Sequence, residues 1–157
     1  MTVEFTTTTT PAQLRLKAMD LLARREHSRH ELADKLKAKF AMGGEDLHML
    51  EKVLDILIED DLLSDQRFAE ALVRSRLHKG QGPKRIIQDL QKRGVAVELA
   101  ARAVEDIDAD WFKLAAAVAD KKYGHSPAED VRERAKRSRF LQYRGFEADQ
   151  ISYALSR

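Results

Sequence analysis

Apolar residues follow the same pattern in two places, about fifty residues apart. One copy reads RGVAVELAARAV from Arg93, and the other reads RGFEADQISYAL from Arg144. Each has an Arg-Gly pair and an apolar residue, followed after a short step by apolar positions three and four residues apart. Side chains at this spacing lie on one face of a helix. Because glycine commonly ends a helix in a left-handed conformation, we expect Gly94 and Gly145 to separate a basic helix from the next helix.

A third, altered copy lies upstream, in LKAKF at residues 36–40, where the glycine is missing and the insertion AMGGE follows. Each copy is preceded by another segment with an apolar face of helical spacing. The pattern therefore predicts a tail at residues 1–10 and three units of three helices, over residues 11–62, 63–107 and 108–157. Units this small bury too little surface alone and must stack on neighbours, so we expect an elongated, curved array.

Capping signals mark where several of these helices should begin. SRHE at residues 28–31 and SPAE at residues 126–129 match the capping box, in which a hydroxyl and a carboxylate satisfy free backbone N–H groups. Pro83 and Pro127 would occupy first helical positions, where the missing donor of proline costs nothing. We expect the middle helix of the third unit to run from Pro127 to about Tyr143.

Composition favours an all-α fold and excludes several protein classes. Of the 157 residues, 34% are charged, with only 7 glycines and 3 prolines. Long charged side chains keep their rotamer freedom on a helix surface. The absence of cysteine excludes disulfides and thiolate metal sites and suits a reducing compartment. No apolar run is long enough to cross a bilayer, and the opening MTVEFTTTTTP lacks an apolar signal core. We expect a soluble, cytoplasmic protein with a disordered threonine-rich tail.

Charge is segregated along the chain, although the net charge is only +2. Residues 74–93 carry seven Lys or Arg and one Asp, a net charge of +6, whereas residues 45–70 carry nine acids and two bases, a net charge of −7. Long charged side chains on a helix are often only a solvated face. If the units stack, however, the basic clusters would align on one side, which suits phosphates or an acidic protein groove. The expected binding residues are Arg24, Arg25, Arg29, Lys84, Arg85, Lys92, Arg93, Arg137, Arg139 and Arg144.

Motifs for catalysis or metal binding are weak. His27 and His30 are three residues apart, but no third ligand has a suitable spacing, so surface or capping roles are the better interpretation. Asp60 and Asp61 are better explained as a solvated turn before a helix cap at Ser64. We therefore expect no enzyme activity, no cofactor and no metal site.

Four aromatic side chains near the third unit admit two interpretations. They could stack on nucleobases, but their helical spacing beside leucines favours packing in the core. The four are Trp111, Phe112, Phe140 and Tyr143.

Four segments, in this order and spacing, resemble the RecX family of recombination regulators: LLARREHSRHELADKL, DDLLSDQRFAEALVRSR, GQGPKRIIQDLQKRGV and FLQYRGFEADQISYAL. The resemblance covers residues 12–157. It implies three tandem three-helix repeats and a modulator that lodges in the groove of the RecA filament on DNA. Such a modulator hinders filament growth, ATP turnover and strand exchange, and so acts in DNA repair, recombination and the SOS response. The expected partners are the RecA filament and DNA, single- or double-stranded, contacted by a monomer directly or through the filament.

A second hypothesis remains open, in which the chain is a sequence-nonspecific DNA-binding protein that uses the basic face alone. Its units would then act as stacked helix-turn-helix modules, and Gln88 and Gln91 could face base edges. Capture of RecA with and without DNA would distinguish the two hypotheses.

Overall fold

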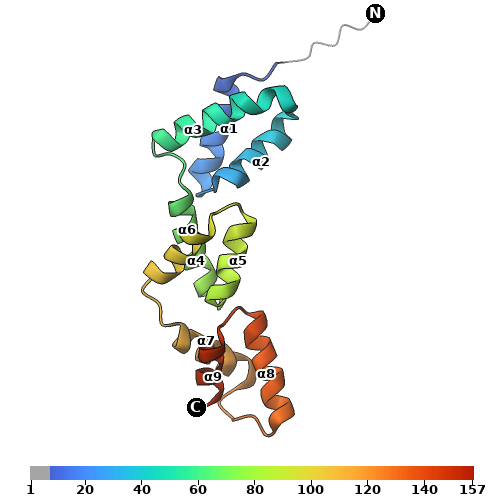
Figure 1. Ribbon diagram of the computed structural model, residues 1–157, viewed down its shortest axis with the longest axis vertical. Helices are drawn as coiled ribbons and strands as arrows, with labels where there is room; N and C mark the ends of the chain where they lie inside the picture. The colour runs from blue at the N-terminus through green and yellow to red at the C-terminus, as the bar shows by residue number, and fades with distance from the viewer. Residues whose placement is uncertain (1–7) are drawn as a thin grey trace, which may run out of the picture. The chain divides into compact units, whose positions relative to one another are not determined.

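The computed structural model describes residues 8–157, which form nine α-helices and one short 3₁₀ helix and contain no strand. They divide into two compact units, one up to Phe68 and one from Ala69 onward. The all-α prediction is confirmed. The helices are α1 (Pro11–Arg24), α2 (Arg29–Phe40), the 3₁₀ helix η1 (Gly44–Asp46), α3 (Leu47–Glu59), α4 (Asp65–His78), α5 (Pro83–Lys92), α6 (Val97–Asp106), α7 (Trp111–Tyr123), α8 (Val131–Tyr143) and α9 (Ala148–Leu155) (Figure 1).

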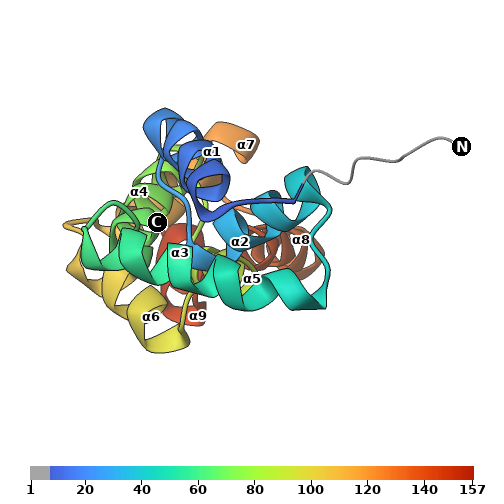
Figure 2. The same cartoon turned by 90° about the horizontal axis from the view of Figure 1, so that it is seen from above.

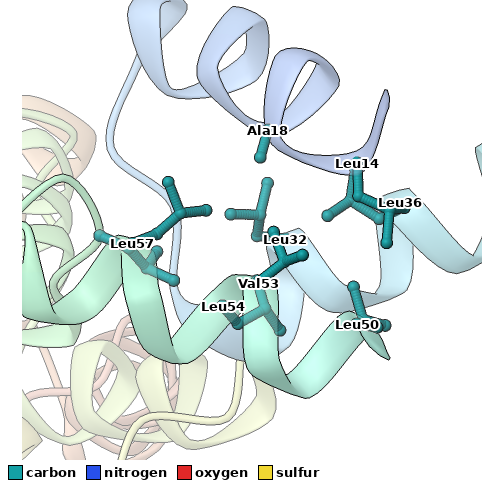
Figure 3. Close-up of a cluster of buried hydrophobic side chains, with 9 residues drawn as sticks. Leu14, Ala18, Leu32, Leu36, Leu50, Val53, Leu54 and Leu57 are labelled. Carbon is teal, nitrogen blue, oxygen red and sulfur yellow. The ribbon is translucent and has the colours of Figure 1, made fainter. Parts of the chain in front are cut away.

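The first unit is built around three helices, in which α1 packs against both α2 and α3 (Figures 1 and 2). Each helix has apolar residues at three- and four-residue spacing and so presents one apolar face to the others. These faces meet in a closed core, whose side chains point toward one another in Figure 3. The labelled core residues are Leu14, Ala18, Leu32, Leu36, Leu50, Val53, Leu54 and Leu57.

Side-chain caps set the helix starts in this unit. The capping box predicted at Ser28 is confirmed, because the Ser28 hydroxyl accepts from the Glu31 N–H at 3.0 Å. Thr10 forms an equivalent box with Gln13 at the start of α1. Residues 1–7 of the expected tail lie outside the described residues. At the end of α2, Ala41 takes the left-handed conformation, with φ +47°, that glycine has in the other two copies.

The second unit contains the remaining two groups of helices. α5 packs against α6, while α7 and α8 both pack against α9. Gly94 and Gly145 have φ values of +85° and +97°, so the predicted left-handed helix ends are confirmed. The core of the last group contains the buried residues Ala115, Ala116, Val118, Ala119, Leu141, Phe146, Ile151 and Ala154.

The predicted start of α8 was wrong. This helix begins at Val131, and its N-cap is Asp130, whose carboxylate accepts from the Glu133 N–H at 2.8 Å. Aspartate caps a helix as well as serine does, so a capping pattern alone does not distinguish a start after Ser126 from one after Asp130. The backbone carbonyl of Ser126 instead accepts a hydrogen bond of 2.8 Å from Arg137.

Two of the four aromatic residues do not lie in the core. Phe112 is 39% exposed and Tyr143 is 73% exposed, so core packing was the wrong interpretation for both. Phe112 instead meets Tyr153 edge to face, with ring centroids 5.7 Å apart. Phe140 does pack against the apolar core of the last group, and Trp111 is partly buried. Helical spacing places a side chain on a face, but the neighbouring helices decide which faces are covered.

Candidate partner-binding surface

The ten predicted binding residues lie in both units. Arg24, Arg25 and Arg29 belong to the first unit, at the end of α1 and the start of α2. The other seven belong to the second unit, on α5, on α8 and in the turns that follow these helices.

Carboxylates pair with all three arginines of the first unit. Two guanidinium nitrogens of Arg25 lie 3.2 Å from the two carboxylate oxygens of Glu31. Arg29 contacts Asp55 at 2.6 Å and Arg24 contacts Asp20 at 3.2 Å. These ion pairs reduce the positive charge that the three arginines offer to a partner.

Of the two roles expected for His27, a surface residue or a helix cap, the structure rules out the first. It is only 1% exposed. Its Nδ1 lies 3.1 Å from the Arg25 carbonyl oxygen and its Nε2 lies 2.9 Å from the ammonium of Lys35. The ring therefore donates to the carbonyl and accepts from the lysine as a neutral imidazole. Burial lowers the pKa of His27, and the nearby positive charges of Arg25 and Lys35 lower it further. Among residues 8–157, no cluster of side chains could hold a metal ion.

The α5 helix carries three of the predicted cations around a buried apolar face, and a fourth, Arg93, is its C-cap. Ile86 and Leu90 are fully buried, as expected from the spacing. Lys84 and Lys92 are exposed. Arg93 is partly buried and makes an interaction within the chain. Lys84 and Lys92 are thus the side chains on this helix that are presented most freely to a partner.

The start of α5 is joined to the turn between α8 and α9. The Gly82 N–H donates to the Arg144 carbonyl at 2.7 Å, and the Lys84 N–H donates to the Gly145 carbonyl at 3.0 Å. These bonds satisfy amide groups that a helix start otherwise leaves free. A Cβ atom at Gly82 would overlap the Gly145 carbonyl, and one at Gly145 would overlap the backbone of Arg85. The two glycines therefore allow the second and third helix groups to approach closely.

Arg85 belongs to this junction and is not a freely exposed cation. Its Nη1 donates to the Tyr143 carbonyl oxygen at 3.3 Å, and its guanidinium lies 4.9 Å from the centroid of the Tyr143 ring. Reversing the charge of Arg85 would therefore disturb packing as well as charge. Neither contact has a signal in the sequence, because the residues are 58 positions apart.

The cations of α8 differ strongly in their surroundings. Arg137 pairs with Glu133 at 3.2 Å, donates to the Ser126 carbonyl and lies 4.9 Å from the Tyr123 ring centroid. Arg144, which follows the helix, donates to the Lys79 carbonyl at 3.0 Å. Arg139 is exposed, and none of the described residues pairs with it. Of the three, Arg139 is the most available to a partner.

A cleft of about 500 Å³ lies beside Arg144 in the second unit. It is bounded by the end of α4 and the following turn, by α7 and by α8. Sequence reasoning missed this cleft because its residues come from three separate segments. The one available signal was DKKYG at residues 120–124, in which two lysines precede a helix-ending glycine. The cations at the cleft are Lys79, Lys121, Lys122 and Arg144.

The fold and its surfaces define a class, that of helical-repeat proteins, in which small helical units present their outer faces to other molecules. Within the described residues, no helix is long and apolar enough to span a membrane. Models of the RecX family match along most of the chain: the first three-helix domain at residues 15–41, the second at residues 64–104 and the third at residues 108–155. The chain belongs to the RecX family, and the predicted three tandem three-helix repeats are confirmed.

Individual relatives agree with this assignment. The regulatory protein RecX of Halorhodospira halophila is 47% identical over 137 residues, which cover 87% of this chain and 83% of that protein. The regulatory protein RecX of Vibrio parahaemolyticus is 42% identical over 139 residues, covering 88% and 87%. The crystal structure of RecX from Lactobacillus salivarius has the same fold, with a TM-score of 0.76, 24% identity and coverage of 93% and 94%. The Halorhodospira and Vibrio relatives are named regulatory proteins, as the resemblance implied.

Proposed function

We propose that this protein regulates the RecA recombinase by binding its filament on DNA and hindering filament extension, ATP hydrolysis and strand exchange. The observation that carries the proposal is membership of the RecX family across all three helical domains. The proposal also places the protein in the cytoplasm, where the recombinase meets the chromosome, and it requires no catalytic group in the regulator itself.

The distribution of charge on the second unit supports an anionic target. Lys84, Lys92 and Arg139 are exposed on α5 and α8. Cations that are not already paired contribute most to attraction toward a negatively charged partner, because a paired cation first has to give up its carboxylate. We therefore assign the main binding role to these three residues. The paired residues Arg25, Arg29 and Arg137 act mainly within their own three-helix groups, where their carboxylate partners lie.

The deciding experiment is a titration of RecA ATPase activity on single-stranded DNA with this protein. We expect the ATPase rate to fall as the protein is added. The double variant Lys84→Glu, Lys92→Glu should inhibit at least about tenfold less effectively, because reversal turns attraction into repulsion. Its helix content should stay unchanged, since exposed substitutions shift stability little.

The matched control reverses two exposed acids of α3, Glu51→Lys and Glu59→Lys. This variant changes the charge by the same amount in the opposite direction and should inhibit as well as the parent. DNA binding without any effect on RecA, and without capture of RecA in the absence of DNA, would instead support the nonspecific DNA-binding hypothesis.

A further inference from the structure

The cleft beside Arg144 combines an apolar floor with a positively charged rim. Its volume of about 500 Å³ lies in the range of ligand-binding pockets, roughly 300–1,000 Å³. The floor is aliphatic and aromatic and consists of Leu114, Ala117, Val118 and Phe140. A surface with both features selects a ligand that carries apolar groups as well as negative charge.

The positive charge of the rim is not compensated locally. Lys79, Lys121 and Lys122 are exposed, and no carboxylate is among the described residues that line the cleft. The acid that precedes Lys121 is Asp120, and it contacts Arg157 at 2.6 Å. Four cations around a concave surface raise the local positive potential and attract an anionic group.

Arg144 supplies a directed donor at one side of the cleft. One guanidinium nitrogen donates to the Lys79 carbonyl oxygen at 3.0 Å, which fixes the position of the group. A guanidinium has five N–H donors, so further donors are left for an incoming acceptor. A carboxylate matches this planar fork in geometry as well as in charge.

We propose that this cleft is a docking site for an acidic polypeptide segment of a partner protein, in which carboxylates alternate with aliphatic side chains. The carboxylates meet Arg144 and the lysines, and an aliphatic side chain covers the floor at Ala117 and Val118. The proposal goes beyond the regulation of RecA and does not depend on it, because it is argued from the chemistry of the cleft alone.

A nucleic-acid strand fits these features less well. Single-stranded nucleic acid needs aromatic faces on which its bases can stack. Two aromatic rings line the cleft, those of Phe140 and His78. Phe140 is already engaged, because the Lys122 ammonium lies 4.7 Å and the Arg144 guanidinium 5.8 Å from its centroid, which leaves the single imidazole of His78 for stacking. The Phe140 ring also meets Tyr123 edge to face, with centroids 5.7 Å apart. The rest of the floor is aliphatic, which suits leucine or isoleucine better than a base.

The test measures the anisotropy of a short fluorescein-labelled peptide in which glutamate alternates with leucine. Two comparison ligands are the same peptide with serine in place of leucine and a labelled oligothymidylate of equal charge. We expect the leucine peptide to bind at least about fivefold more tightly than the serine peptide. Equal binding of the two peptides, or tighter binding of the oligothymidylate at this cleft, would overturn the proposal.

Two variants test the rim and the floor separately. Lys79→Glu combined with Lys121→Glu should weaken binding of the leucine peptide at least about tenfold. Ala117→Phe fills the exposed floor without changing any charge and should weaken it at least about fivefold. The control is Arg132→Glu combined with Lys136→Glu, two exposed cations of α8 that do not line the cleft, and it should change binding less than about twofold.

All variants are compared at equal helix content, measured by circular dichroism, so that misfolding is recognised. Full binding of the leucine peptide by the Ala117→Phe variant would exclude the cleft as the docking site. An equal loss of binding in the control variant would show that only overall charge matters. Either result would leave the regulation of RecA untouched, because that function is tested by the ATPase titration.

Discussion

A single buried imidazole links the end of α1 to α2. His27 contacts the Arg25 carbonyl through one ring nitrogen and the Lys35 ammonium through the other. Protonation would place a second positive charge against Lys35 and remove the acceptor of its hydrogen bond. This is why the neutral form is favoured and why the pKa of His27 is lowered below its ordinary value of 6.5.

The lowered pKa of His27 predicts a pH-dependent stability. The unfolded chain binds a proton at this residue near pH 6.5, whereas the folded chain resists it until the pH is lower. The contribution of His27 is therefore complete above about pH 6.5 and is lost as the pH falls through its folded pKa. We expect the melting temperature to fall between about pH 7.5 and about pH 5.5, and His27→Gln to flatten that fall.

The control for this experiment is His48→Gln, because His48 is an exposed histidine of α3 in the same unit. Its pH profile should follow that of the parent. If His27→Gln also followed the parent profile, the imidazole would not be the group that titrates with unfolding.

Substitution of Gly145 by alanine should lower the stability of the fold strongly, for two reasons. Alanine there would have a left-handed backbone and would also overlap the backbone of Arg85. Gly124 controls for backbone strain without overlap, since its φ is +74° and its ψ is −168°, a region that favours glycine, but a Cβ atom there would meet nothing within 4 Å. We expect Gly145→Ala to cost roughly 2–5 kcal/mol and Gly124→Ala roughly 1–3 kcal/mol in urea unfolding, with the larger loss at Gly145. Equal losses would contradict the close approach at Gly145.

At the scale of elements, the start of α8 depends on a carboxylate and not on the upstream serine. Asp130→Ala should cost about 1 kcal/mol in the free energy of unfolding, because the Glu133 N–H loses its acceptor. Ser126→Ala should cost much less, since it is the backbone carbonyl of Ser126 that accepts from Arg137. A larger loss for Ser126→Ala than for Asp130→Ala would favour the predicted helix start at Pro127 over the observed start at Val131. Urea titrations of both variants measure the difference.

Most helices were predictable because their signals are local. The capping box at Ser28, the proline at the start of α5 and the left-handed glycines after α5 and α8 each lie within a few residues of the boundary that they mark. The prediction of the start of α8 failed because two equally good caps lie four residues apart, at Ser126 and Asp130. Which cap is used depends on how the loop after α7 packs, and Arg137 takes part in that packing.

At the scale of the whole molecule, a net charge of +2 conceals the groups that can meet phosphates. Each phosphate contact releases condensed counterions, so the logarithm of the DNA association constant should fall linearly with the logarithm of salt concentration. Replacing Lys84 and Lys92 by alanine should reduce that slope by about 2, or roughly 0.9 for each lost contact. Arg24→Ala should change it less, because Asp20 already pairs with Arg24. An unchanged slope in the lysine variant would mean that neither Lys84 nor Lys92 contacts DNA phosphates.

The sequence by itself determined the helical fold, the repetition of three-helix domains and the family, because all three follow from local periodicity and from segments in a recognisable order. It also determined which charges the chain carries. It did not determine which of these charged side chains are engaged within the chain, because their partners are distant in sequence: Arg29 contacts Asp55, and Arg85 contacts Tyr143.

Only the tertiary structure decided which cations remain available and where a cleft forms. The cleft requires α7, α8 and the turn after α4 to meet, and the close approach of the second and third helix groups requires Gly82 to lie against Gly145. Gly80 in the turn after α4 lies 34 positions from Leu114 of α7, and Gly82 lies 63 positions from Gly145, so neither arrangement leaves a periodic trace along the chain. Burial and pairing depend on the folded surface. They leave Lys84, Lys92 and Arg139 as the most freely presented of the ten cations that the sequence suggested.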